Sequence, residues 1–147
     1  MLGSKMLTMR TFVINGVDLS TTGVKFVAPP IGTVPGRLQE APTYVVCGLG
    51  IVATAAINNA VIAIEEVRSD GTVVNRGSLT VSVTSANVGK PIVITPSAPI
   101  QCYLGSAFRL NVTTAGGSGA AAHIAVHYVT SEEILPRQRV EFEVKNV

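Results

Sequence analysis

Residues 79–84 read Leu-Thr-Val-Ser-Val-Thr, and this stretch decides the fold class. Apolar and hydroxyl side chains alternate with a period of two, which is the pattern of a strand with one face in a core and the other in water. The same period returns near the C-terminus, where Val140, Phe142 and Val144 alternate with charged residues. Half-buried strands of this kind pair antiparallel. The sequence therefore predicts an all-β, antiparallel fold.

Outward from this stretch, short strand-like runs separated by turn residues fill the chain. Strands are expected at residues 10–15, 23–28, 43–56, 60–68, 77–84, 91–95, 100–104, 108–114, 121–130 and 139–145. Between two of them lies Ser69-Asp70-Gly71-Thr72, and Asp-Gly is the strongest short signal for a two-residue type I′ hairpin. About eight to ten short strands in one domain predict a two-sheet antiparallel β-sandwich, arranged like a jelly roll.

The first 40 residues differ in composition from the rest. Residues 27–36 read Val-Ala-Pro-Pro-Ile-Gly-Thr-Val-Pro-Gly, and this much proline favours an extended chain that does not pair fully in a sheet. We expect a single domain in two parts. Residues 1–40 form an extended Pro-rich N-terminal arm together with the first strands, and residues 41–147 form the β-sandwich.

Charge is scarce and unevenly placed. Only 14% of the 147 residues are charged, against about 25% in an ordinary soluble domain. Between Arg76 and Glu132 the only charged residues are Lys90 and Arg109. One interpretation is a serine- and threonine-rich sheet face in water. The other is a face covered by further copies of the chain or by another protein, because interface cores are depleted in charge.

Targeting features and cysteines indicate a protein made in a cytoplasm. Residues 41–64 are uncharged and long enough to span a bilayer as a helix, but glycines, asparagines and β-branched residues interrupt them, so we expect no membrane span. Residues 1–13 lack the apolar core of a secretory signal. Cys47 and Cys102 lie in apolar strand-like runs; we expect two buried small side chains, with a disulfide as the alternative.

Residues 44–53, Tyr-Val-Val-Cys-Gly-Leu-Gly-Ile-Val-Ala, hold the motif that most invites a chemical interpretation. A strand followed by G-x-G-x-x-A resembles the dinucleotide-binding fingerprint of Rossmann enzymes, in which Glu65 or Glu66 would bind the ribose. Few residues are available for the helix that should follow, so we favour a buried strand with a glycine bulge. A helix over 51–59 would instead support a nucleotide-binding enzyme.

His123 and His127 are four residues apart. On a helix they could bind one metal ion, but on a strand they lie about 13 Å apart, and the surrounding alternation favours a strand. We therefore expect surface or interface histidines, and we predict no catalytic residue, cofactor or metal site. Loop aromatics such as Tyr103 and Phe108 are the candidates for stacking on a sugar.

The arm of residues 1–40, the strand series of residues 43–130 and the glycine-rich loop of residues 115–120 together resemble the small β-sandwich decoration, or cement, proteins of tailed-bacteriophage capsids. This resemblance implies a non-enzymatic virion structural protein, located on the capsid surface, that reinforces the shell as a homo-oligomer, with a trimer favoured. Its partners would be the major capsid protein and itself, with no nucleic acid, membrane or small-molecule substrate. The alternatives are a carbohydrate- or receptor-binding module of a virion and a Rossmann-type enzyme.

The arm supplies the candidates for contact with a partner, since an extended segment can lie along a neighbouring surface by strand addition. The candidate partner-binding residues are Arg10, Phe12, Pro29, Pro30, Ile31, Pro35 and Arg37. The charged alternation of residues 139–145 suits an edge strand, in which charges discourage uncontrolled pairing.

Overall fold

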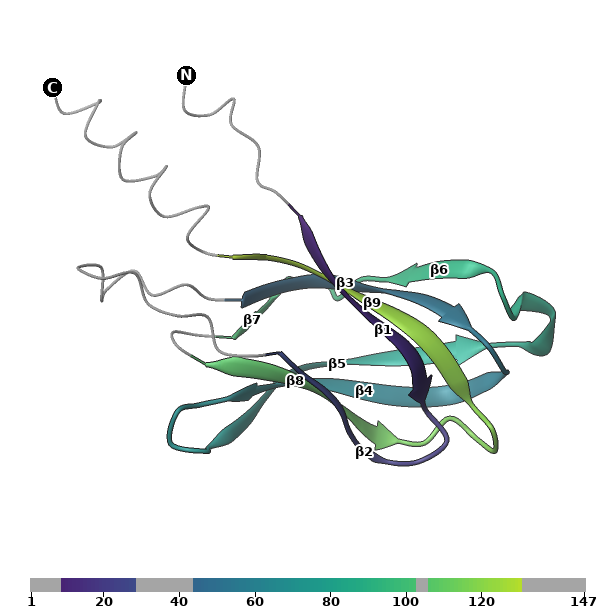
Figure 1. Ribbon diagram of the computed structural model, residues 1–147, viewed down its shortest axis with the longest axis horizontal. Helices are drawn as coiled ribbons and strands as arrows, with labels where there is room; N and C mark the ends of the chain where they lie inside the picture. Colours follow the sequence, from purple (N-terminus) through teal and green to yellow (C-terminus); the bar gives the residue numbers. More distant parts are fainter. Residues whose placement is uncertain (1–8, 29–43, 103–105, 131–147) are drawn as a thin grey trace, which may run out of the picture.

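The computed structural model describes residues 9–28, 44–102 and 106–130 of the chain. Within these ranges nine strands form two antiparallel sheets that pack face to face, and the only helix is the short 3-10 turn η3 (Ser85–Asn87) (Figure 1). The strands are β1 (Arg10–Asp18), β2 (Gly23–Ala28), β3 (Tyr44–Ala53), β4 (Ile57–Val67), β5 (Val73–Val83), β6 (Pro91–Ile94), β7 (Ile100–Cys102), β8 (Ala107–Thr114) and β9 (Ala121–Thr130). The predicted all-β sandwich is confirmed.

The upper sheet in Figure 1, which we call sheet A, has the strand order β1-β9-β3-β6, and β7 also pairs with β3. The lower sheet, sheet B, has the order β2-β8-β4-β5. The pairs β1:β9, β2:β8, β3:β6 and β4:β5 are all antiparallel and nest one inside another along the chain. A long hairpin rolled into two sheets gives this nesting, which is the jelly-roll arrangement that the sequence predicts.

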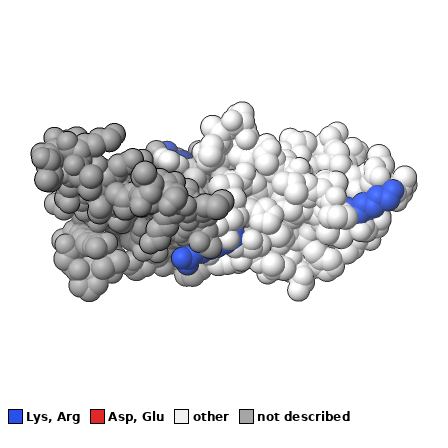
Figure 2. Space-filling model, turned by 90° about the horizontal axis from the view of Figure 1, so that it is seen from above, with Lys and Arg blue, Asp and Glu red and all other residues white. Residues whose placement is uncertain are grey.

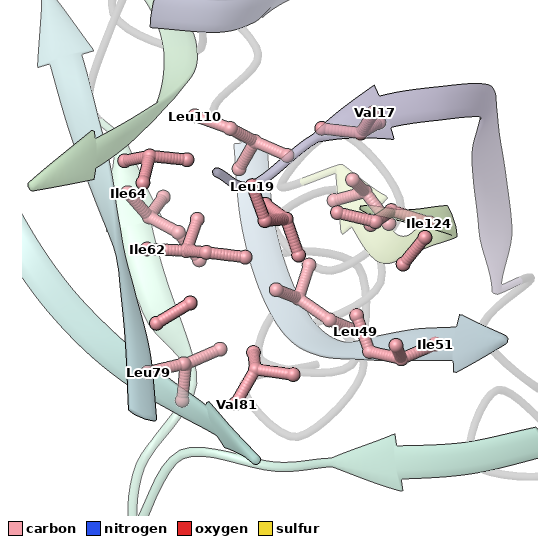
Figure 3. Packing of buried hydrophobic residues seen from close by; sticks show 14 of the residues in the cluster. Val17, Leu19, Leu49, Ile51, Ile62, Ile64, Leu79, Val81, Leu110 and Ile124 are labelled. Atoms are coloured by element: carbon pink, nitrogen blue, oxygen red, sulfur yellow. The ribbon is translucent and has the colours of Figure 1, made fainter. Parts of the chain in front are cut away.

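The hydrophobic core lies between the sheets, where alternate residues of each strand meet (Figure 3). In β5, Leu79, Val81 and Val83 are buried, whereas Thr80 and Ser82 between them are exposed. The predicted alternation is therefore confirmed. The apolar residues that meet them include Leu49, Ile51 and Ile124 of sheet A and Ile62, Ile64 and Leu110 of sheet B. Each such side chain stabilises the fold by roughly 1.5–3 kcal/mol.

The β4–β5 hairpin forms where the Asp-Gly pair predicts it, but the predicted type I′ turn is wrong. Gly71 has a φ of +88°, and Asp70 does not have the positive φ that a type I′ turn needs. Gly71 N–H donates to the Arg68 carbonyl (2.9 Å) and Arg68 N–H to the Thr72 carbonyl (2.9 Å), so the loop has three residues and ends on the left-handed glycine. Hydrogen bonds from Thr72 to the Asp70 carboxylate close the turn and lower the pKa of Asp70.

The β3–β4 turn lies earlier in the chain than the sequence predicts. The strands predicted over residues 43–56 and 60–68 leave residues 57–59 for the turn, but the turn occupies residues 54–56. Asn59 instead lies inside β4 with a φ of +50°, where the register against β5 shifts. Asparagine tolerates this left-handed conformation in a bulge as well as in a turn. The predicted strand at 139–145 lies outside the described residues.

The described chain begins, ends and is interrupted at the same end of the sandwich (Figure 1). At this end Arg10 pairs with Tyr128, and Tyr44 pairs with both Thr130 and Cys102. Five aromatic rings pack together there: Phe12, Phe26, Tyr44, Phe108 and Tyr128. Within the predicted 1–40 region, the described residues supply β1 to sheet A and β2 to sheet B, so they belong to the sandwich itself.

Candidate functional site

The outer face of sheet A is built from cross-strand rows of small and apolar residues. Val13 pairs with Ala125, Ala125 with Gly50, and Gly50 with Val93, so these four residues form one row across β1, β9, β3 and β6. Val13 and Val93 are 68% and 65% exposed, whereas Gly50 and Ala125 are half-buried. The row therefore consists of two exposed valines with a dent of small residues between them.

An open cavity of about 340 Å³ lies over this dent. Its lining is almost entirely apolar and holds no charged side chain; its polar side chains are those of His123 and His127. His123 belongs to the neighbouring row with Val52 and Pro91, and His127 pairs with Thr11 of β1. The cavity and its surroundings form an uncharged surface that spans four strands.

Both histidines lie on β9 and contact β1. Gly16 N–H donates to Nδ1 of His123 at 3.0 Å, and Thr11 Oγ1 lies 3.2 Å from Nδ1 of His127. A backbone N–H can only donate, so Nδ1 of His123 carries no proton in this arrangement. A Cβ added at Gly50 would stand 3.2 Å from Nε2 of His127, which places this ring at the border of the dent. Among the described residues no three potential ligands group around a metal ion.

The glycine motif of residues 44–53 lies within β3 and precedes no helix. Residues 51–59 contain the end of β3, a turn and the start of β4, so the helix that dinucleotide binding requires does not form there and the Rossmann interpretation is wrong. The register shifts between Val46 and Gly48, which confirms the predicted bulge. A Cβ at Gly48 would stand 3.0 Å from the Ile94 carbonyl oxygen. Glycine therefore allows β6 to approach β3 closely.

The two glutamates that the motif would have assigned to a ribose form ion pairs in sheet B. Glu65 accepts from Nε of Arg109 at 2.7 Å and from Nδ2 of Asn111 at 3.1 Å. Glu66 points into the interior, fully buried, and accepts from Nη2 of Arg76 at 2.8 Å. Both carboxylates are therefore engaged within the sheet.

The outer face of sheet B is polar, and its side chains bond to one another. Ser82 Oγ donates to Oδ1 of Asn59 at 2.6 Å and accepts from Asn59 N–H at 3.0 Å. Asn75 donates to Ser78 Oγ at 3.3 Å on the same face. Together with the Glu65 ion pair, these bonds form a surface suited to water.

Charge thus separates the two sheets. The strands of sheet A carry only Arg10 and Asp18, at the two ends of β1. The strands of sheet B carry Lys25, Glu65, Glu66, Arg76 and Arg109. Figure 2, which looks onto sheet A, shows a described surface with no acidic residue and with basic residues only at its margins. The charge deficit of the sequence is concentrated on this face.

Of the predicted partner-binding residues, the structure describes two. Arg10 is exposed at the start of β1, and Phe12 is half-buried, with its ring stacked on that of Tyr128 at 4.6 Å between centroids. The Phe12 ring therefore supports one end of the sandwich, and its contact with a partner stays a prediction. The others, Pro29, Pro30, Ile31, Pro35 and Arg37, lie outside the described residues.

The proposed sugar-stacking aromatics do not form a platform in the described chain. Phe108 is fully buried in β8, so the prediction that it stacks on a sugar is wrong. Its ring contacts that of Tyr44 edge-on at 4.8 Å instead. Tyr103 lies outside the described residues.

Both cysteines are free thiols, as the buried-residue prediction requires. Cys102 is fully buried and Cys47 is half-buried. Burial raises the pKa of Cys102 to about 12 and also raises the pKa of Cys47. A raised thiol pKa leaves little thiolate at neutral pH, so neither group is poised as a nucleophile.

The partner-binding residues predicted from the sequence do not include the central row, which consists of Val13, Ala125, Gly50 and Val93. One signal does point to them. Residues 92–94 read Ile-Val-Ile, which places apolar side chains on both faces of β6. A strand that is apolar on both faces is covered on both faces in most proteins.

Comparisons with known proteins found neither a family model that matches this chain nor a matching curated protein. Within the described residues, no helix is long and apolar enough to cross a membrane. The two sheet faces are therefore the features of this chain that bear on its function.

Proposed function

We propose that this chain is a non-enzymatic structural protein of a virion, which binds a tailed-phage capsid as a homo-oligomer and reinforces the shell. The observation that carries the proposal is the uncharged outer face of sheet A. Contiguous apolar surface on a soluble domain marks a site of interaction, and interface cores are depleted in charge.

The contrast with sheet B strengthens this inference. Both outer faces expose valines, but Val24 and Val27 of sheet B pair with Asn111 and Arg109, which bind Glu65, whereas Val13 and Val93 of sheet A lie in a row without charge. Covering the face of sheet B would therefore desolvate charged groups, whereas covering the face of sheet A would remove mainly apolar area from water.

The fold supports the proposal by analogy only. Jelly rolls recur in viral capsid domains and also in lectins, so the arrangement of strands does not by itself assign a function. The lectin alternative lacks a described aromatic platform, because Tyr44, Phe108 and Tyr128 pack against one another. We therefore favour the capsid-binding function.

Two measurements test the proposal. Sedimentation velocity should show an oligomer, and the chain should co-sediment saturably with capsids assembled from a tailed-phage major capsid protein, raising their melting temperature. Deletion of residues 1–8 should weaken co-sedimentation, since an arm adds contact with the shell, while circular dichroism remains that of the folded sandwich. The deletion stops before Arg10 because this residue begins β1. A monomer that binds no capsid would refute the proposal.

A further inference from the structure

We infer that the outer face of sheet A is occupied by a second copy of this chain, with the two A sheets packed face to face about a two-fold axis. The inference rests on the proposed function, in which the chain is a homo-oligomer, and it names the surface and the symmetry of the contact.

The absence of charge favours a second copy over a different protein. A two-fold contact sets the same surface patch against itself, so like charges meet unless they are arranged in complementary positions. The cavity over Gly50 is lined by no charged side chain, and the strands around it carry charge only at the two ends of β1. Such a face meets itself without repulsion, whereas specific contact with an unlike partner commonly uses complementary charge.

The relief of the face provides shape for the contact. Val13 and Val93 stand at the two sides of the row, and Gly50 and Ala125 leave a dent between them. With the two faces fully overlapped about an axis parallel to the strands, Val93 of each copy lies over Val13 of the other, and the two depressions face each other. The same pair of residues then meets twice, as a two-fold contact requires.

The area available is sufficient for a specific contact. The face comprises β1 with 9 residues, β3 and β9 with 10 each, and β6 with 4. At about 3.4 Å per residue and about 4.8 Å between strands, it covers about 500 Å². Two copies would bury about 1,000 Å², which is where specific interfaces begin.

The edges of sheet A are poorly suited to strand addition, which leaves the face as its docking surface. At one edge, the register of β1 against β9 breaks at a bulge where Gly16 has a φ of +65°. At the other edge, β6 has only four residues and begins at Pro91. Bulges, proline and short length are features that block edge-to-edge pairing.

Substitution of the exposed valines tests the inference. We expect Val93→Lys and Val13→Lys each to weaken self-association roughly 100-fold in sedimentation velocity. The reason is that a two-fold contact buries two new ammonium groups, one from each copy. The matched control is Val24→Lys, which changes an exposed valine (44%) on the outer face of sheet B. This control should associate like the wild type, and circular dichroism should show that all three variants fold.

Complementary variants test the two-fold geometry directly. Val93→Lys and Val13→Glu should each be monomeric, and the double variant should associate again, because opposite charges at positions 93 and 13 then meet across the contact. A trimer, or association that neither Lys substitution on sheet A weakens, would overturn the inference. A wild-type monomer that binds capsids, and loses this binding in Val93→Lys, would also overturn it. That last result would show that the capsid covers the face and would leave the proposed function standing.

Discussion

The outer faces of the two sheets differ in the side chains that they present to solvent. On sheet B, Glu65 pairs with Arg109, and Ser82 bonds to Asn59, so polar groups satisfy one another within the face. On sheet A, the central row presents Val13 and Val93 around a dent of small residues. A low average charge can thus arise from one ordinary polar face and one face that lacks charge almost entirely.

The two faces also differ in what it would cost to cover them. Covering the face of sheet B would remove water from the Glu65–Arg109 ion pair, and desolvation of charges opposes association. Covering the face of sheet A removes mainly apolar area from water, which favours association. The same sandwich therefore has one face whose bonds stabilise the single copy and one face that is stabilised by contact. Substitutions on sheet B should lower the stability of the copy, and those on sheet A should lower association.

Among the substitutions on the two outer faces, the largest effect on stability is expected at the Glu65 ion pair. Glu65→Ala leaves the Arg109 guanidinium and the Asn111 amide without their acceptor, so we expect the free energy of unfolding to fall by about 2 kcal/mol. Urea denaturation in a Val93→Lys background measures this loss without a contribution from association.

A double-mutant cycle provides the control for Glu65. Arg109→Ala should cost less in the Glu65→Ala background than in its presence, because the partner is already missing. In the chain with Val93 intact, Glu65→Ala should leave the association constant unchanged. A weakened association with no loss of stability would reverse the assignment of the two faces.

A smaller loss is expected at Ser82. Ser82→Ala removes the acceptor of Asn59 N–H and the donor to the Asn59 side chain, and Asn59 is the residue with a φ of +50°. We therefore expect the free energy of unfolding to fall by about 1 kcal/mol. The loss should shrink in an Asn59→Gly background, because glycine adopts this conformation without strain. Equal losses in the two backgrounds would show that Ser82 does not hold the bulge.

Much of the fold could be predicted because the decisive patterns are local. The alternation over residues 79–84 depends only on the two-residue period of a strand, and β5 follows it. Turn residues were less informative, since they signal a positive φ without saying whether a turn or a bulge will use it. Asn59 was expected in a turn and forms a bulge, while the β3–β4 turn is made by residues 54–56.

The uncharged face could be predicted only in outline. The charge deficit between Arg76 and Glu132 is visible in the sequence, but this segment contributes β8 to sheet B and β9 to sheet A. Which residues of this segment lie on the solvated face and which lie on the uncharged face depends on which strands become neighbours. The row that joins Val13 to Val93 exists only once β1, β9, β3 and β6 lie side by side. Register between distant strands is set by tertiary packing, which no local pattern encodes.

The smallest effect is expected at His123, which is the counterpart of Ser82 on sheet A. Each accepts a hydrogen bond from the backbone N–H of a positive-φ residue in a bulge, Gly16 for His123 and Asn59 for Ser82. Glycine needs no support at this φ, and the exposed Gly16 N–H can bond to water instead. His123→Ala should therefore cost at most about 0.5 kcal/mol in the Val93→Lys background. A loss as large as that of Ser82→Ala would mean that bonds within sheet A stabilise the single copy as much as those of sheet B, and the contrast between the two faces would then rest on charge alone.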